Sequence, residues 1–98
     1  MVSKDLKMGN VIITVSIYPE DPEIDLGKVL EQAKKIIEEF GGKYYEHKET
    51  PIAFGLKSLD VRFIYPDQEF KEEDLISKLQ EIEGVQSAEV TNITLASL

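Results

Sequence analysis

Residues 49–63 read ETPIAFGLKSLDVRF, a segment whose two halves differ in character. Apolar and polar side chains alternate over Leu56–Tyr65, which predicts a β-strand with one buried face. The first half is irregular, because Pro51 fixes its own backbone torsion and Gly55 permits a turn that is closed to other residues. Phe54 lies between these two positions, in a predicted loop that precedes the strand.

Five further elements are predicted around this strand. The first of them is rich in β-branched residues, and the helices repeat apolar residues at spacings of three and four. Asp25 is an N-cap candidate for the first helix, and Gly41 with Gly42 ends it. In chain order the five are a strand at Asn10–Tyr18, a helix at Ile24–Phe40, a strand at Lys43–Glu49, a helix at Phe70–Gly84 and a strand at Val85–Leu95.

The order β-α-β-β-α-β indicates the fold class. Two helices that each have one apolar face need a shared apolar surface to cover. A four-stranded antiparallel sheet with both helices on one face supplies it, which is the ferredoxin-like α+β plait. The other sheet face carries mostly polar side chains with a few apolar ones, so we expect it to be either solvated or a contact surface.

Composition limits the classes of function. The chain has 98 residues and no cysteine, which predicts one domain over residues 9–98, preceded by a loose tail at residues 1–8, and no disulfides. It has no apolar run near the roughly 18 residues of a membrane span and no signal-peptide pattern, so we expect a cytoplasmic protein that does not bind membranes. Its net charge of −8 repels phosphate backbones and argues against direct binding of nucleic acid.

No constellation for covalent chemistry is recognisable. His47 is the only histidine and has no partners at metal-ligand spacing. The acidic run from Glu20 to Asp25 lacks the ligand pattern of a calcium loop, and Gly41-Gly42 lacks the Lys-Ser/Thr of a phosphate loop. We therefore expect neither an enzyme nor a bound metal or cofactor.

Phe54 has two interpretations from chemistry alone. Either Phe54 or Ile52 folds back and fills the end of the core, or Phe54 is an exposed aromatic side chain that anchors a protein partner. The residues themselves leave both interpretations open.

The segment PIAFGLKSL resembles the signature of the guanine-nucleotide-exchange domain of translation elongation factor 1-beta, in its short archaeal form. The resemblance takes in MGNVIITVSIYPEDPEIDL near the start and IEGVQSAEVTNI near the end, and it covers roughly Met8–Leu98. It implies a ferredoxin-like plait that promotes GDP release from elongation factor 1-alpha, the GTPase that carries aminoacyl-tRNA to the ribosome.

The resemblance also implies two groups of contact residues. The first is Phe54, with its neighbours Pro51, Ile52, Ala53 and Gly55 positioning it against the GTPase. The second is the C-terminal strand and tail, where the family uses a basic residue to disturb the magnesium and phosphate site. This tail reads TNITLASL, with no Lys or Arg after Lys78, so the implied contacts here are Asn92, Thr94, Leu95 and Leu98. Wedging by the tail, weaker exchange and a different partner all remain open.

The competing class is a ligand-binding or oligomerising plait without a GTPase partner. Such a module would use the open sheet face, where Ile12, Tyr18 and Ile64 are the apolar candidates. The exchange interpretation predicts a monomer when the protein is free.

Overall fold

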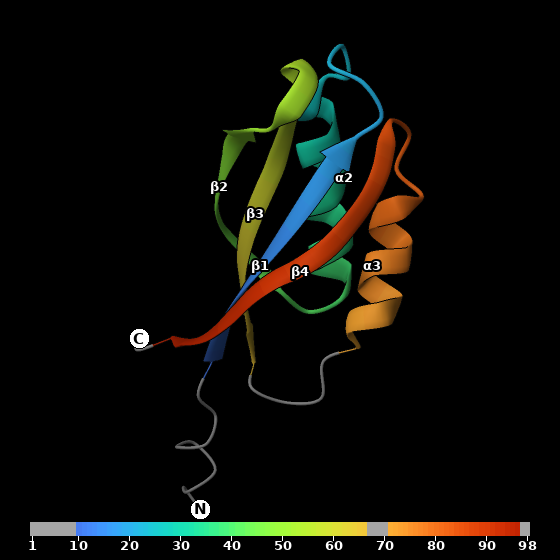
Figure 1. The fold of residues 1–98 in the computed structure, drawn as a ribbon. Coiled ribbons are helices and arrows are strands. Elements are labelled where there is room, and N and C mark those ends of the chain that lie inside the picture. The colour runs from blue at the N-terminus through green and yellow to red at the C-terminus, as the bar shows by residue number, and fades with distance from the viewer. Residues whose placement is uncertain (1–9, 67–70, 97–98) are drawn as a thin grey trace, which may run out of the picture.

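The computed structural model describes residues 10–66 and 71–96. The predicted tail at residues 1–8, Phe70 at the predicted start of the second helix, and Leu98 lie outside the described residues. The predicted order of strands and helices is confirmed, with one short 3-10 turn added (Figure 1). The elements are β1 (Asn10–Pro19), α2 (Leu26–Glu39), β2 (Lys43–Pro51), η1 (Ala53–Gly55), β3 (Lys57–Pro66), α3 (Glu72–Gln80) and β4 (Val85–Ala96).

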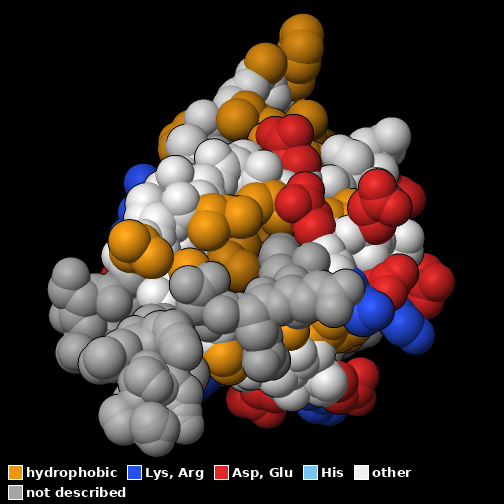
Figure 2. All heavy atoms as spheres, turned by 90° about the horizontal axis from the view of Figure 1, so that it is seen from below, with side chains coloured by type: hydrophobic (Ala, Val, Ile, Leu, Met, Phe, Trp, Pro, Cys, Tyr) orange, Lys and Arg blue, Asp and Glu red, His pale blue; other side chains and the backbone are white. Residues whose placement is uncertain are grey.

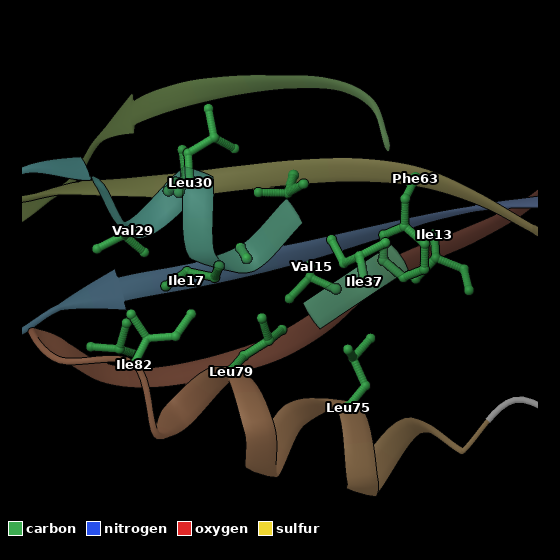
Figure 3. Packing of buried hydrophobic residues seen from close by; sticks show 14 of the residues in the cluster. Ile13, Val15, Ile17, Val29, Leu30, Ile37, Phe63, Leu75, Leu79 and Ile82 are labelled. Carbon is green, nitrogen blue, oxygen red and sulfur yellow. The ribbon is translucent and has the colours of Figure 1, made fainter. Parts of the chain in front are cut away.

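The sheet has the strand order β2-β3-β1-β4, and every neighbouring pair is antiparallel. The register pairs Ile13 with Phe63 and with Ile93, so alternate residues of the two central strands share one face. Side chains from both helices pack on that face, as Figure 3 shows for Leu30, Ile37, Leu75 and Leu79. The predicted ferredoxin-like plait is therefore confirmed.

The core consists of the alternating apolar residues predicted for the strands and the apolar stripes predicted for the helices. Phe63 is the largest fully buried side chain, at 1% exposed. The buried members are Ile13, Val15, Ile17, Val29, Leu30, Ala33, Ile37, Leu59, Val61, Phe63, Tyr65, Leu75, Leu79, Ile82 and Val85.

Helix ends follow the predicted signals with one difference. The Asp25 side chain accepts a hydrogen bond from the Gly27 N–H at 2.9 Å, and Gly41 ends α2 with a φ of 96°. The second helix is shorter than predicted, because its last turn tightens. The Ile82 N–H donates to the Leu79 carbonyl at 3.2 Å in an i to i+3 pattern, which still buries Ile82 against the core.

Gly42 leaves no room for a side chain. A Cβ there would lie 2.8 Å from Phe63 Cδ2 and 2.9 Å from Ile37 Cγ2, and both neighbours are buried. We predict that Gly42→Ala lowers the free energy of unfolding by about 1–3 kcal/mol through overpacking. Urea unfolding followed by circular dichroism measures it. Lys35→Ala on the exposed side of α2 should change stability by less than about 0.5 kcal/mol, and an equal loss in both variants would contradict the explanation.

Candidate functional site

Phe54 projects from the loop between β2 and β3 and is 92% exposed. Ile52 beside it is 40% exposed, and neither residue belongs to the buried core cluster. The interpretation in which one of them fills the end of the core is therefore wrong. The loop instead presents an aromatic and an aliphatic side chain to solvent at one end of the sheet, uppermost in Figure 1.

The backbone at Phe54 is left-handed, with φ 60° and ψ 32°. This conformation costs an L-residue about 1–2 kcal/mol, and a bulky aromatic residue rarely adopts it. Two short hydrogen bonds close the loop around it: the Ile52 N–H donates to the Leu56 carbonyl at 2.8 Å, and the Leu56 N–H donates to the Ala53 carbonyl at 3.1 Å. Gly55 follows with φ 77°, where glycine carries no strain.

Acidic side chains lie beside this loop. A groove of about 290 Å³ runs between the loop and the turn after β1, and its lining includes Asp21, Asp25 and Glu49. Lys57 is the basic residue in this lining, and it lies 3.8 Å from Glu49 in an exposed ion pair. The groove therefore has an acidic character that suits a basic partner surface.

The predicted C-terminal contact residues that the structure describes fall at the other end of the sheet. Thr94 pairs with Ile12, and Leu95 pairs with Val11, near the far end of β1. A register shift at Thr14 leaves Thr91 as an extra residue in β4, a β-bulge. After the bulge, Asn92 and Thr94 lie on the open sheet face, whereas Leu95 lies on the helix side and is 77% exposed. Leu98 lies outside the described residues.

The predicted contact residues thus form two groups and not one site. Lys57 begins β3 next to the Phe54 loop, and Tyr65 near its end pairs with Val11, the partner of Leu95. At about 3.3 Å per strand residue, the groups lie on the order of 25–30 Å apart. Figure 2 shows the molecule from the end of the sheet at which β4 finishes; hydrophobic side chains gather near the centre of this view, and most acidic side chains lie to one side of them. A partner that contacts both groups must be large.

The open sheet face carries a polar network that the sequence analysis missed. The Asp60 carboxylate accepts hydrogen bonds from Ser16 at 2.8 Å, Ser58 at 3.1 Å and Thr50 at 2.7 Å. Alternation placed Ser58 and Asp60 on this face. Their convergence with Ser16 and Thr50 depends on the register of three strands, for which the sequence has no direct signal.

Other side chains on this face are also paired. Arg62 donates to Glu46 at 2.7 Å, and the Tyr18 hydroxyl donates to Glu89 at 2.8 Å. The hydrogen bond to Glu89, with burial and the carboxylate's charge, raises the pKa of Tyr18 above its ordinary value of 10.0. The hydroxyl therefore stays protonated as a donor at neutral pH. Ile12 and Ile64 are cross-strand partners here and are half-buried.

The described residues 10–66 and 71–96 contain no group of three His, Asp or Glu side chains placed to hold a metal ion. His47 lies on β2 with its Nδ1 2.6 Å from the Tyr44 hydroxyl, and it is exposed. Within the same ranges, neither helix is long and apolar enough to cross a membrane.

The order of the elements and the antiparallel sheet define a ferredoxin-like plait domain, which exposes large hydrophobic side chains at both ends of the sheet. Residues 12–95 match the EF-1 guanine nucleotide exchange domain family, and the chain belongs to that family. The family's role is nucleotide exchange in translation elongation.

Curated relatives match this chain along nearly their whole length. Elongation factor 1-beta of Nanoarchaeum equitans is 45% identical over 82 residues, covering 84% of this chain and 100% of the relative. Elongation factor 1-beta of Archaeoglobus fulgidus is 36% identical over 88 residues, covering 90% and 99%. The solution structure of the C-terminal domain of the MgtC protein from Mycobacterium tuberculosis matches with a TM-score of 0.63 at 12% identity, covering 92% of this chain and 90% of that one. That likeness concerns the fold alone.

Because Phe54 is exposed and its backbone is strained, its side chain should contribute little to stability. We predict that Phe54→Gly leaves the free energy of unfolding unchanged or raises it by up to about 1 kcal/mol, since glycine adopts positive φ freely. Urea unfolding measures the change. Phe63→Ala is the matched control and should cost about 3–5 kcal/mol, because that ring is buried. A loss above about 1 kcal/mol for Phe54→Gly would show that the ring packs against the domain.

Proposed function

We propose that this domain promotes release of GDP from elongation factor 1-alpha, the GTPase that carries aminoacyl-tRNA to the ribosome. The observation that carries the proposal is Phe54, a 92% exposed aromatic side chain held in a strained conformation, in a chain of the exchange-domain family. Strained residues persist where the surroundings hold them and where they serve recognition. Aromatic side chains, Phe among them, are also enriched at the centres of protein interfaces, where a few buried residues contribute most of the binding energy.

An exchange factor needs no covalent chemistry. It binds the nucleotide-free GTPase more tightly than the nucleotide-bound form, and by linkage it weakens nucleotide binding by the same factor. Equal affinity for both forms would shift nothing. Loss of magnesium from the GTPase would assist, because that ion neutralises the charge of the phosphates.

In this proposal the two groups of contact residues have different roles, one in docking and one at the nucleotide site. Phe54, supported by Pro51, Ile52, Ala53 and Gly55, docks on one region of the GTPase through apolar burial. The C-terminal group, Asn92, Thr94, Leu95 and Leu98, presses on the nucleotide site about 25–30 Å away along the sheet. A rigid sheet between the groups couples them, since movement of one end relative to the other would require breaking strand pairing.

The resemblance implies a basic side chain near Thr94 or Leu95, and the described part of the tail instead exposes large apolar side chains there and nearby. Ile93 is 48% exposed and Leu95 is 77% exposed, although both are large and hydrophobic. We infer that this tail acts as an apolar wedge that displaces parts of the nucleotide site and does not compete with magnesium by charge.

Charge would guide the encounter. The net charge of −8 and the acidic groove beside Phe54 favour approach to a basic surface, such as one that binds tRNA. In this proposal the free domain is a cytoplasmic monomer with no direct contact to nucleic acid or membrane. The exposed charged side chains of the open face, among them Arg62, Glu46 and Glu89, support it over an oligomerising module, because burying ionised groups in an interface would cost their hydration.

Stopped-flow release of fluorescent GDP from the GTPase tests the anchor. At sub-saturating factor, Phe54→Ala should slow release by at least about tenfold, since a central aromatic contact contributes about 2 kcal/mol or more. Circular dichroism should show an intact fold. Unchanged release with Phe54→Ala would contradict the role of this residue.

The control for the whole mechanism uses the wild-type domain on a solid support. The immobilised domain should retain nucleotide-free GTPase and release the GTPase when GDP and magnesium are added. Equal retention of the loaded and the empty GTPase would refute the exchange function, whatever the variants do.

Removal of residues 94–98 tests the wedge. We predict that the shortened domain still binds nucleotide-free GTPase, because Phe54 remains, but that its maximal rate of GDP release falls by about tenfold or more. The same stopped-flow assay at saturating factor measures this rate. Leu95→Lys is the informative comparison, because it restores a basic side chain near the place where the family has one. An unchanged maximal rate in the shortened domain would remove the tail from the mechanism.

A further inference from the structure

The Asp60 network joins three of the four strands through one carboxylate. Oδ1 accepts hydrogen bonds from Ser16 on β1 and Ser58 on β3, and Oδ2 accepts one from Thr50 on β2. Ser58 is 4% exposed and Ser16 is 7% exposed, so two of the donors are buried. Hydrogen bonds to an ionised carboxylate are about twice as strong as those between neutral groups, and they are stronger still when shielded from water.

The three hydroxyl protons of the network are directed at the Asp60 carboxylate. Because Ser16, Ser58 and Thr50 all donate to Asp60, they do not offer those protons to a bound molecule. Arg62, on the same face of the sheet, is paired with Glu46 at 2.7 Å. We therefore interpret the hydrogen bonds of Asp60 with Ser16, Ser58 and Thr50 as contacts that hold three strands together and not as a ligand site, and we call this network the brace.

The brace lies at the base of the Phe54 loop. Thr50 pairs with Ser58 across β2 and β3, and it directly precedes Pro51, the last residue of β2 before the loop. Phe54 occupies a conformation that is unfavourable by itself, so contacts outside the residue must select it. Thr50 is the last residue before the loop whose side chain is fixed to the body of the sheet by a hydrogen bond.

We propose that Asp60 is a positioning residue that acts through Thr50 to hold the β2–β3 loop in the conformation that presents Phe54 to the GTPase. The inference rests on the proposed exchange function, in which Phe54 is the anchor. A loop that samples other conformations has a smaller fraction in the binding-competent form, and the apparent affinity falls by that fraction. The contact at the nucleotide site is distant and unaffected.

Thr50→Val tests the proposal, because valine has nearly the same shape as threonine and lacks the donor. We expect the factor concentration that gives half-maximal GDP release to rise by about three- to tenfold, which corresponds to the ordinary net contribution of one hydrogen bond. The maximal release rate should stay the same. Thr50→Ser keeps the hydroxyl and should behave like the wild type, and Thr14→Val makes the same change on the same face outside the network.

A double-mutant cycle separates positioning from general stability. In a Phe54→Ala background, Thr50→Val should cause no further rise in the half-maximal concentration, because no anchor remains to be positioned. Its effect on the urea midpoint should be equal in both backgrounds. An equal rise in both backgrounds, or no rise with wild-type Phe54, would overturn the proposal.

A measurement without the GTPase tests the effect of Thr50 on the loop separately from the exchange function. Amide hydrogen exchange at Ile52, whose N–H bonds to Leu56, should be at least about threefold faster in Thr50→Val and unchanged in Thr14→Val. If the wild type fails to release GDP while the Ile52 amide responds as expected, the exchange function is wrong and the brace stands. If GDP release depends on Phe54 but the Ile52 amide does not respond to Thr50→Val, the brace is wrong and the exchange function stands.

Discussion

The structure depends on one constraint: a single face of a four-stranded sheet must be covered. Both helices meet that need on the same side, and the alternation of β1 and β3 places Ile13, Val15, Val61 and Phe63 beneath them. In a chain of 98 residues nearly all large apolar side chains are needed there. The large apolar residues left outside this core, Phe54 above all, are therefore the residues on which the proposed contacts with a protein partner depend.

The fold could be predicted from the sequence because its signals are local and agree with one another. Alternation marks the strands, spacing of three and four marks the helices, and Asp25 and Gly41 mark the ends of α2. The second helix was predicted too long, since a stop at Gly84 does not reveal that the last turn tightens after Gln80. The sequence indicated which strands are neighbours but not the register in which their residues pair, and the bulge at Thr91 could not be predicted.

The candidate site could be predicted only in part. The resemblance indicated Phe54 and the tail, and residue chemistry alone could not decide whether Phe54 was buried. The ring is exposed because the backbone at Phe54, between Pro51 and Gly55, is left-handed and because hydrogen bonds close the loop around it. Both features depend on the folded loop and cannot be recognised from the residue types alone. Asp60 was missed for a similar reason. A lone Asp in an alternating strand is ordinary, and its importance comes from three hydroxyls delivered by strand register.

The bulge in β4 has a consequence for the side chains that follow it. Because one extra residue at Thr91 resets the alternation, Asn92 and Thr94 face one side and Leu95 the other. Deletion of Thr91 would move the side chains of residues 92–95 to the opposite face of the sheet, although none of those residues would itself be changed. The single extra residue at Thr91 therefore decides which of the following side chains face the helices and which face the open side of the sheet, whatever residues stand there.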